Sequence, residues 1–304
     1  MYTSLTNGLP HPSLSKLNLP KLRNLMLGGA LMLNAATALA AEKLWQIDNL
    51  HQPESVVAGP AGQVIYISNI NGNPIELNGK GYISRATVDG ELTEQYWIEG
   101  LDAPKGMAIV NGQLYIADMQ RVHIVDIASG KVIRQLTAPD AQMLNDITAS
   151  PDGTVYVSDL LGGAIYRIRQ DRLESWFRSA QVPHPNGLLW HKGAMLVAGW
   201  GSPLRQDFTT QTPGSLYRLD IDNQALTPVA SGYQLGNLDG IVARKDSLYI
   251  SDWISGELFR LRGKERHRLI APGAGLADIG LSGTTLFAPM MMDNRVVAWQ
   301  TDKE

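Results

Sequence analysis

The chain has 304 residues, of which 44% are hydrophobic and 18% charged, with 30 glycines and 16 prolines. This composition excludes a disordered chain and is typical of a globular protein with many turns. The formal net charge of −3, without any block of five like charges, argues against a nucleic-acid or anionic membrane partner.

The first forty residues differ from the remainder and have the pattern of a secretory signal peptide. Lys16, Lys21 and Arg23 precede an apolar run from Leu25 to Leu33, and Ala38-Leu-Ala40 has the small residues that a signal peptidase accepts. We therefore expect residues 1–40 to be a cleaved signal and residues 41–304 to form the mature domain.

An uncleaved N-terminal anchor is the alternative interpretation of this segment. It is disfavoured because the apolar run is short for a bilayer and is interrupted by Asn34. The chain has no cysteine, so an oxidising compartment is compatible with it although no disulfide stabilises the fold. We expect a periplasmic or secreted protein without stable membrane insertion after cleavage.

After the signal, a short β-rich phrase recurs six times along the chain. The copies are Val64-Ile-Tyr-Ile-Ser68, Leu114-Tyr-Ile-Ala-Asp118, Val155-Tyr-Val-Ser-Asp159, Met195-Leu-Val-Ala-Gly199, Leu248-Tyr-Ile-Ser-Asp252 and Leu286-Phe-Ala-Pro-Met290. The last residues of successive copies lie 50, 41, 40, 53 and 38 residues apart. These spacings are close to the length of a four-stranded propeller blade. The repeat predicts a single-domain, all-β, six-bladed β-propeller with four antiparallel strands in each blade.

The last repeat has three recognisable strands, near 277–281, 285–289 and 295–299, and the chain ends before a fourth. An open ring would leave unpaired strand edges. We expect the segment from Lys43 to Asp48 to supply the missing strand and close the ring.

Aligning the repeats on these phrases places one position of each innermost strand in register. This position, which we call the column, is occupied by Glu54, Lys105, Asn145, Asn186, Asp239 and Ala277. Four of the six residues carry a side-chain oxygen, at the end of the strands that crowd around the propeller axis. Polar strand ends can simply hydrogen-bond to water in the channel, but four oxygens in one column favour a shared ligand.

A hard divalent cation is the ligand that this column predicts. Ca²⁺ takes about six to eight oxygens from carboxylates, amides and water without needing His or Cys. Glu54, Asn145, Asn186 and Asp239 are therefore the expected ligands of one Ca²⁺, with Mg²⁺, Mn²⁺ or Zn²⁺ as alternatives. Zinc is the least favoured because no ligand is His or Cys.

These motifs resemble the regucalcin/gluconolactonase/luciferin-regenerating-enzyme group of six-bladed propellers, which is related in architecture to paraoxonases and diisopropylfluorophosphatase. The resemblance covers roughly residues 43–300 and is carried by Pro53-Glu54, Leu144-Asn145-Asp146, Pro185-Asn186-Gly187-Leu188 and Leu238-Asp239-Gly240. Members bind a divalent ion through Glu, Asn, Asn and Asp at these motifs and commonly hydrolyse lactones or related esters. The resemblance implies a metal-dependent lactonase acting on a small molecule.

In this hypothesis the cation polarises the lactone carbonyl and stabilises the oxyanion that forms when water adds. The resemblance suggests that Asp239 also orients or deprotonates the attacking water. Asp146 is a second candidate base, although a hydrogen bond at the start of its strand is the favoured interpretation. No Gly-x-Ser-x-Gly nucleophile motif is present, which disfavours a covalent serine mechanism.

Lys105 is the column residue of the second repeat, and its positive charge would be repelled by a cation bound at the column. An inward ammonium could itself neutralise the two carboxylates, leaving a metal-free secreted binding module. Beside a dication it would be repelled by several kcal/mol at an effective dielectric constant of about 20. We therefore expect Lys105 to lean outward and bind substrate. A phosphotriesterase-like hydrolase is a further alternative.

Two insertions follow the second strands of the first and fourth repeats, at 69–81 and 199–214. In a propeller they emerge beside the column, so we expect them to border the site. Trp200 and Arg205 are candidate substrate contacts, and His184 is a candidate proton carrier near the mouth. Asp118, Asp159 and Asp252 end second strands, where turn-capping roles are expected.

Overall fold

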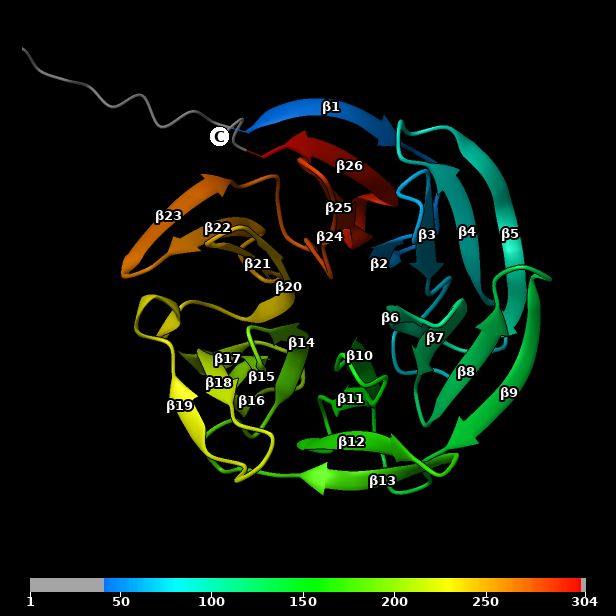
Figure 1. The fold of residues 1–304 in the computed structure, drawn as a ribbon. Coiled ribbons are helices and arrows are strands. Elements are labelled where there is room, and N and C mark those ends of the chain that lie inside the picture. The colour runs from blue at the N-terminus through cyan, green and yellow to red at the C-terminus, as the bar shows by residue number, and fades with distance from the viewer. Residues whose placement is uncertain (1–40, 302–304) are drawn as a thin grey trace, which may run out of the picture. The chain divides into compact units, whose positions relative to one another are not determined.

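The computed structural model describes residues 41–301, so the predicted signal segment and its cleavage site lie outside the described residues. The described residues belong to one unit, residues 38–304. They form six four-stranded antiparallel sheets arranged in a ring, which confirms the predicted six-bladed β-propeller (Figure 1). Among residues 41–301 no helix has the length and apolarity needed to cross a bilayer.

The first three blades each use four consecutive strands, from the innermost to the outermost. Their bounds are β2 (Pro53–Ala58), β3 (Val64–Asn69), β4 (Gly81–Thr87) and β5 (Leu92–Leu101); β6 (Pro104–Val110), β7 (Gln113–Asp118), β8 (Arg121–Asp126) and β9 (Lys131–Thr137); β10 (Leu144–Ala149), β11 (Val155–Asp159), β12 (Ala164–Arg169) and β13 (Arg172–Phe177).

The fourth blade carries an added hairpin, β16–β17, and a short 3₁₀ helix precedes the fifth. The bounds of these elements are β14 (Pro185–His191), β15 (Ala194–Gly199), β16 (Gly201–Leu204), β17 (Thr210–Pro213), β18 (Leu216–Leu219) and β19 (Leu226–Pro228); η1 (Ala230–Gly232); β20 (Leu238–Arg244), β21 (Ser247–Asp252), β22 (Glu257–Arg262) and β23 (Glu265–Ile270). The insertion at 199–214 is therefore a β-hairpin rather than an irregular loop.

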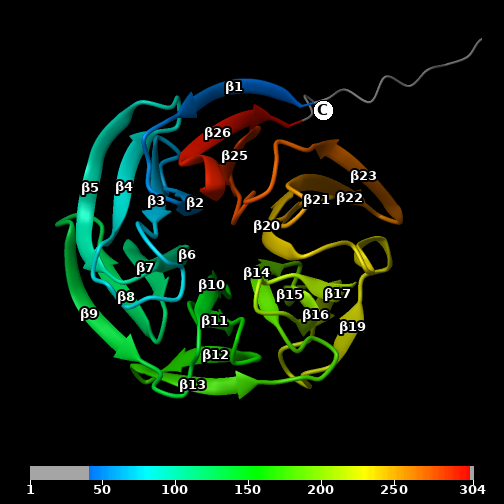
Figure 2. The same ribbon diagram turned by 180° about the vertical axis from the view of Figure 1, so that it is seen from behind.

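The sixth blade joins the two ends of the described chain, as the sequence predicted. It contains β24 (Gly280–Ser282), β25 (Thr285–Met290), η2 (Met291–Asp293) and β26 (Arg295–Gln300), with β1 (Glu42–Ile47) as its outermost strand. β1 pairs antiparallel with β26 over the length of both strands, so the edge of the last blade is covered (Figure 2).

The innermost strand of the sixth blade is shorter than expected, because β24 begins at Gly280 rather than near residue 277. Just before it, Asp278 forms a parallel bridge with Ser55 of the first blade, and its N–H donates to the Glu54 carbonyl at 2.8 Å. Leu276 and Ala277 already pair with Met290 and Pro289 of β25, so the chain contacts both β25 and β2 before β24 begins.

Apolar side chains fill the spaces between neighbouring blades. At the junction of the first and sixth blades, Ile47 of β1 packs in a cluster that includes Val56, Phe287 and Val296. Trp45 packs on Phe287 with ring centroids 5.7 Å apart and donates its indole N–H to Val88 O at 3.0 Å. The closing strand is therefore anchored by packing as well as by backbone pairing.

Replacing Ile47, which is 5% exposed, tests this closure. Ile47→Ala should lower the free energy of unfolding by about 2–5 kcal/mol, because it leaves a cavity between two blades. Leu44→Ala, in the same strand but 42% exposed, should change it by less than about 0.5 kcal/mol. Urea unfolding followed by tryptophan fluorescence measures both, and equally small effects would mean that β1 does not belong to the cooperative unit.

Candidate functional site

The column lies at a shared irregularity of the innermost strands. In five blades the pairing between the first and second strands shifts by one residue at the column. The last regularly paired residue before the shift is Pro53, Pro104, Leu144, Pro185 or Leu238. Such a shift is the mark of a β-bulge, which re-aims side chains and often lies beside functional sites. The column residue is thereby freed from regular pairing in each of these blades.

Serines in the recurring phrase hydrogen-bond to the backbone that this irregularity releases. The N–H groups of Ser55, Asp146 and Gly240 each follow a column residue and donate to the hydroxyls of Ser68, Ser158 and Ser251 at 2.8–2.9 Å. These bonds occur in the first, third and fifth blades. A buried amide without such a partner would be costly, so the serines stabilise the bulged strand ends.

Asn186 is followed by glycine because a side chain at position 187 would clash with the next blade, not because the pair forms a turn. A Cβ on Gly187 would lie 1.8 Å from the backbone oxygen of Asp239. Asn186 and Gly187 both belong to β14, so the pair lies in a strand rather than in a turn. The glycine lets the inner strands of the fourth and fifth blades approach closely enough for their column residues to touch.

The four oxygen-bearing column residues are all buried, with exposed fractions of 0–4%. Asn186 Nδ2 donates to Asp239 Oδ1 at 2.9 Å and to Leu238 O at 3.1 Å. Three oxygens, Glu54 Oε2, Asn145 Oδ1 and Asn186 Oδ1, are buried without a hydrogen-bond partner among residues 41–301. Asn186 therefore uses its nitrogen within the protein and leaves its oxygen unpaired.

The carboxyl groups of several blades act on one another electrostatically. Burial raises the pKa of Glu54 well above its usual value, and the nearby carboxyls of Asp239, Asp278 and Asp146 raise it further, while Lys105 opposes the shift. Burial also raises the pKa of Asp239 well above its usual value, followed by the effect of Asp278. Carboxyls from the first, third, fifth and sixth blades thus converge.

Asp278 is the member of this group that sequence reasoning missed. It is buried, and burial raises its pKa to about 7, opposed by a hydrogen bond from Ser55 Oγ to Asp278 Oδ2 at 2.5 Å. Its signal was its place directly after the column residue Ala277, which matches that of Asp146 in the third repeat. Asp278 was missed because only the column position of each repeat was considered for the site.

Asp146 is held by backbone amides on both oxygens. Its Oδ1 accepts from Ile147 N and its Oδ2 from Leu188 N, each at 2.6 Å. Burial, and next the charge of Asp278, raise its pKa well above the usual value. The bond from Leu188 joins the third and fourth blades, which supports the hydrogen-bonding interpretation of Asp146. Its role as a base stays a prediction.

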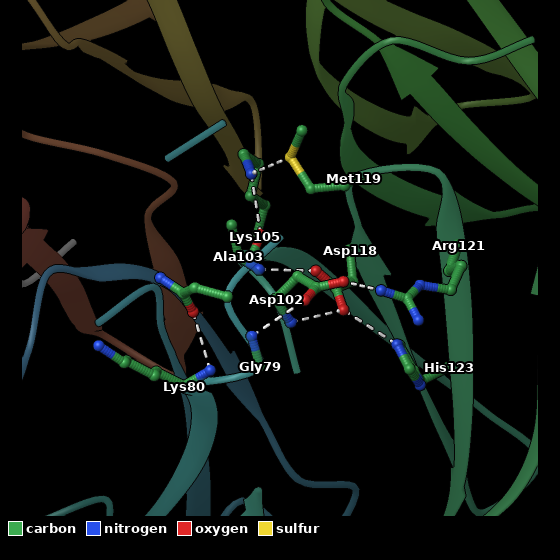
Figure 3. A network of polar contacts seen from close by, with 10 residues as sticks. Gly79, Lys80, Asp102, Ala103, Lys105, Asp118, Met119, Arg121 and His123 are labelled. Carbon is green, nitrogen blue, oxygen red and sulfur yellow. Dashed lines mark hydrogen bonds and ion pairs between the residues drawn. The ribbon is translucent and has the colours of Figure 1, made fainter. Parts of the chain in front are cut away.

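Lys105 is buried and bonded within the protein, and its role in binding substrate stays a prediction. Its Nζ donates to Ala103 O at 2.8 Å and lies 3.6 Å from Met119 Sδ (Figure 3). It also donates to Pro74 O at 2.9 Å. These partners use the three donors of the ammonium group. Burial lowers the pKa of Lys105 to about 8, opposed by Glu54 and then by Asp118. The bond to Pro74 holds the insertion of the first blade over the column.

The aspartates that end second strands act as turn acceptors, as expected. Asp118 accepts from Ala103 N at 2.7 Å and Asp102 N at 3.0 Å, and it lies 3.0 Å from His123 Nε2 (Figure 3). Asp102 in turn pairs with Arg121. Asp159 and Asp252 accept backbone N–H groups of the turns around them in the same way.

The other predicted substrate residues occupy different positions on the fourth blade. Trp200 is buried and donates its indole N–H to Phe208 O at 2.8 Å. Arg205 is exposed on the β16–β17 hairpin. His184 is half-buried, with Nδ1 3.0 Å from Leu160 O, and lines a pocket of about 200 Å³ with Tyr217 and Tyr233. That pocket contains no column residue, so its surface is distinct from the column.

Within residues 41–301, no cluster of three or more His, Cys, Asp or Glu side chains has the arrangement of a metal site. The four predicted ligands include only two carboxylates, the other two being amides. The chemistry that the structure presents is thus a buried set of carboxylate and amide oxygens, three of them unpaired, beside a single buried ammonium.

Comparison with known proteins shows the fold of this chain. No protein-family model and no curated protein sequence matches it. Among solved structures, selenomethionine-substituted virginiamycin B lyase from Staphylococcus aureus is similar, with a TM-score of 0.57 and 13% identity over 86% of this chain and 99% of that chain. At this identity the likeness concerns the six-bladed propeller alone.

Proposed function

We propose that this protein is a hydrolase of lactones or related small esters that works with one divalent cation, Ca²⁺ in the simplest case. Glu54, Asn145, Asn186 and Asp239 would hold the cation at the propeller axis. The observation that carries the proposal is the set of three buried, unpaired oxygens, Glu54 Oε2, Asn145 Oδ1 and Asn186 Oδ1. Buried oxygens without partners are costly, and a hard cation supplies the missing interaction.

The charges around the column support the same proposal. Within residues 41–301, Glu54, Asp146, Asp239 and Asp278 are buried carboxyl groups near one another, and Lys105 is the ammonium that acts on Glu54. Its donors go to two carbonyl oxygens and a thioether, so it makes no ion pair with a carboxylate. A metal-free binding module, in which Lys105 neutralises the cluster, fits these contacts less well.

The proposed reaction adds water to the carbonyl carbon of the lactone and breaks the ring C–O bond, the leaving oxygen taking up a proton. A bound cation would polarise the carbonyl and stabilise negative charge on its oxygen. Asp239 would accept the proton of the attacking water. Asn186 Nδ2, bonded to Asp239 Oδ1, fixes the orientation of that carboxylate and leaves its second oxygen for water.

Fold likeness supports an enzyme more weakly. The solved structure compared above is named a lyase, so a protein with a similar fold carries the name of an enzyme. With the predicted signal at residues 1–40, we place the activity in the periplasm or outside the cell.

The unloaded protein should become less stable as pH rises from about 5 to 8. The raised pKa values mean that the folded protein keeps protons which the unfolded chain has released, so the free energy of unfolding falls as pH rises toward the folded pKa, about 7 for Asp278. The melting temperature of the protein, measured across this pH range in the presence of a chelator, tests the predicted loss of stability. Added Ca²⁺ should raise it, and more at pH 8 than at pH 5.

Asp278→Asn provides the control, because it removes a carboxyl charge while keeping an oxygen for Ser55. It should flatten the fall of melting temperature with pH. A chelated protein whose melting temperature rises over this range, together with no effect of Ca²⁺, would contradict the charge account.

Asp239→Ala should abolish calorimetric Ca²⁺ binding and lower kcat/KM on a lactone panel by about 100-fold or more, because it removes both a ligand and the base. Asp246→Ala is the matched control, since Asp246 is an exposed aspartate that pairs with Lys192 on the surface and lies outside the column. It should leave both measurements unchanged. Wild-type turnover that withstands a chelator, or an active Asp239→Ala variant, would refute the proposal.

A further inference from the structure

A second column of equivalent residues lies beside the first. The residue that directly follows the second strand is apolar in every one of the six blades. We call this set the apolar collar; it consists of Ile70, Met119, Leu160, Trp200, Trp253 and Met291. Turn positions after strands are usually polar, so six apolar residues at this one position need a common cause.

Backbone hydrogen bonds place the collar directly beside the column. In five blades the collar N–H donates to the carbonyl of the residue two before the column residue, at 2.8–3.1 Å: Ile70 to Gln52, Leu160 to Met143, Trp200 to His184, Trp253 to Asn237 and Met291 to Gly275. In the second blade, Met119 Sδ lies 3.6 Å from Nζ of the column residue Lys105. The collar thus adjoins the column in all six blades.

The collar side chains form one cluster around the axis. Their cluster also contains Ala103, Met143 and the column residue Ala277, so it draws on every blade. Five of the six collar residues are 1–7% exposed, and Trp253 is half-buried. The rings of Trp200 and Trp253 lie 6.1 Å apart.

Three exposed apolar residues follow collar residues closely in the chain. Ile75 and Leu77, on the insertion that follows Ile70, are 46% and 61% exposed, and Met292, next to Met291, is 62% exposed. A hydroxyl-rich sugar lactone would find few partners here, because Trp200 already donates its indole N–H to Phe208 O. Burying unpaired hydroxyls against such a surface is unfavourable, whereas burying methylenes is favourable.

We propose that the substrate is an apolar lactone or ester, whose reacting carbonyl reaches the column while its hydrocarbon part packs against the collar. This inference rests on the proposed hydrolase function and names its substrate class. Met119 and Met291 suit such a ligand because methionine side chains adapt to irregular shapes.

A homologous series of γ-lactones, from butyrolactone to dodecalactone, tests this substrate class. For wild type, kcat/KM should rise by up to about fourfold for each added methylene until the collar is filled. D-Glucono-1,5-lactone should be a poorer substrate than an aliphatic lactone of similar size. An equal or higher kcat/KM for the sugar lactone, with no dependence on chain length, would overturn the inference while leaving the hydrolase function standing.

Variants of collar residues test whether the dependence of kcat/KM on chain length arises at the collar. Trp200→Ala should flatten the chain-length dependence. Trp190→Ala is the matched control, since Trp190 is a half-buried tryptophan of the same blade that packs in a different cluster. It should keep the wild-type dependence, and thermal melting confirms that each variant is folded. A dependence lost in Trp190→Ala but kept in Trp200→Ala would contradict the placement.

Direct binding separates this inference from the proposed chemistry. 2-Pyrrolidinone and its 5-octyl derivative are lactam analogues that resist hydrolysis, and their binding can be followed by tryptophan fluorescence. Tighter binding of the octyl compound by wild type than by Trp200→Ala, without turnover of any lactone, would support an apolar site but refute the hydrolase function. Equal affinity for both lactams would refute the apolar site whatever the activity.

Discussion

Most features of this site follow from one constraint: the protein buries unpaired oxygen atoms and carboxyl groups where six strands meet. Glu54, Asn145, Asn186 and Asp239 come from four blades, and three of their oxygens lack a partner within residues 41–301. Burial and mutual repulsion raise the pKa values of the carboxyls. Such a centre is unfavourable unless protons or a cation compensate the charge.

The surrounding scaffold holds this centre in place. A shared register shift at the column frees the functional side chains, and serines of the second strands bond to the amides released in alternate blades. Gly187 allows the fourth and fifth blades to approach, and Asp146 links the third blade to the fourth. Because β1 completes the sixth blade, the ring that brings these strands together is closed.

Sequence reasoning predicted those parts of the fold that repeat. The recurring phrase predicted six blades, and the shortage of strands in the last repeat predicted closure by the segment that forms β1. The column was found because alignment places equivalent strand positions together. What it missed depends on contacts between blades: the late start of β24, the buried carboxyl of Asp278 and the burial of Lys105. Lys105 is buried because three acceptors, including Pro74 O from the insertion of the first blade, surround its ammonium.

Anomalous diffraction from crystals soaked in Mn²⁺ or a lanthanide tests the central claim most directly. The account predicts one strong peak at the propeller axis, with oxygens of Glu54, Asn145, Asn186 and Asp239 about 2.0–2.6 Å from it. A fully soaked crystal without a peak among these four residues, or with the Lys105 ammonium in that place, would contradict it.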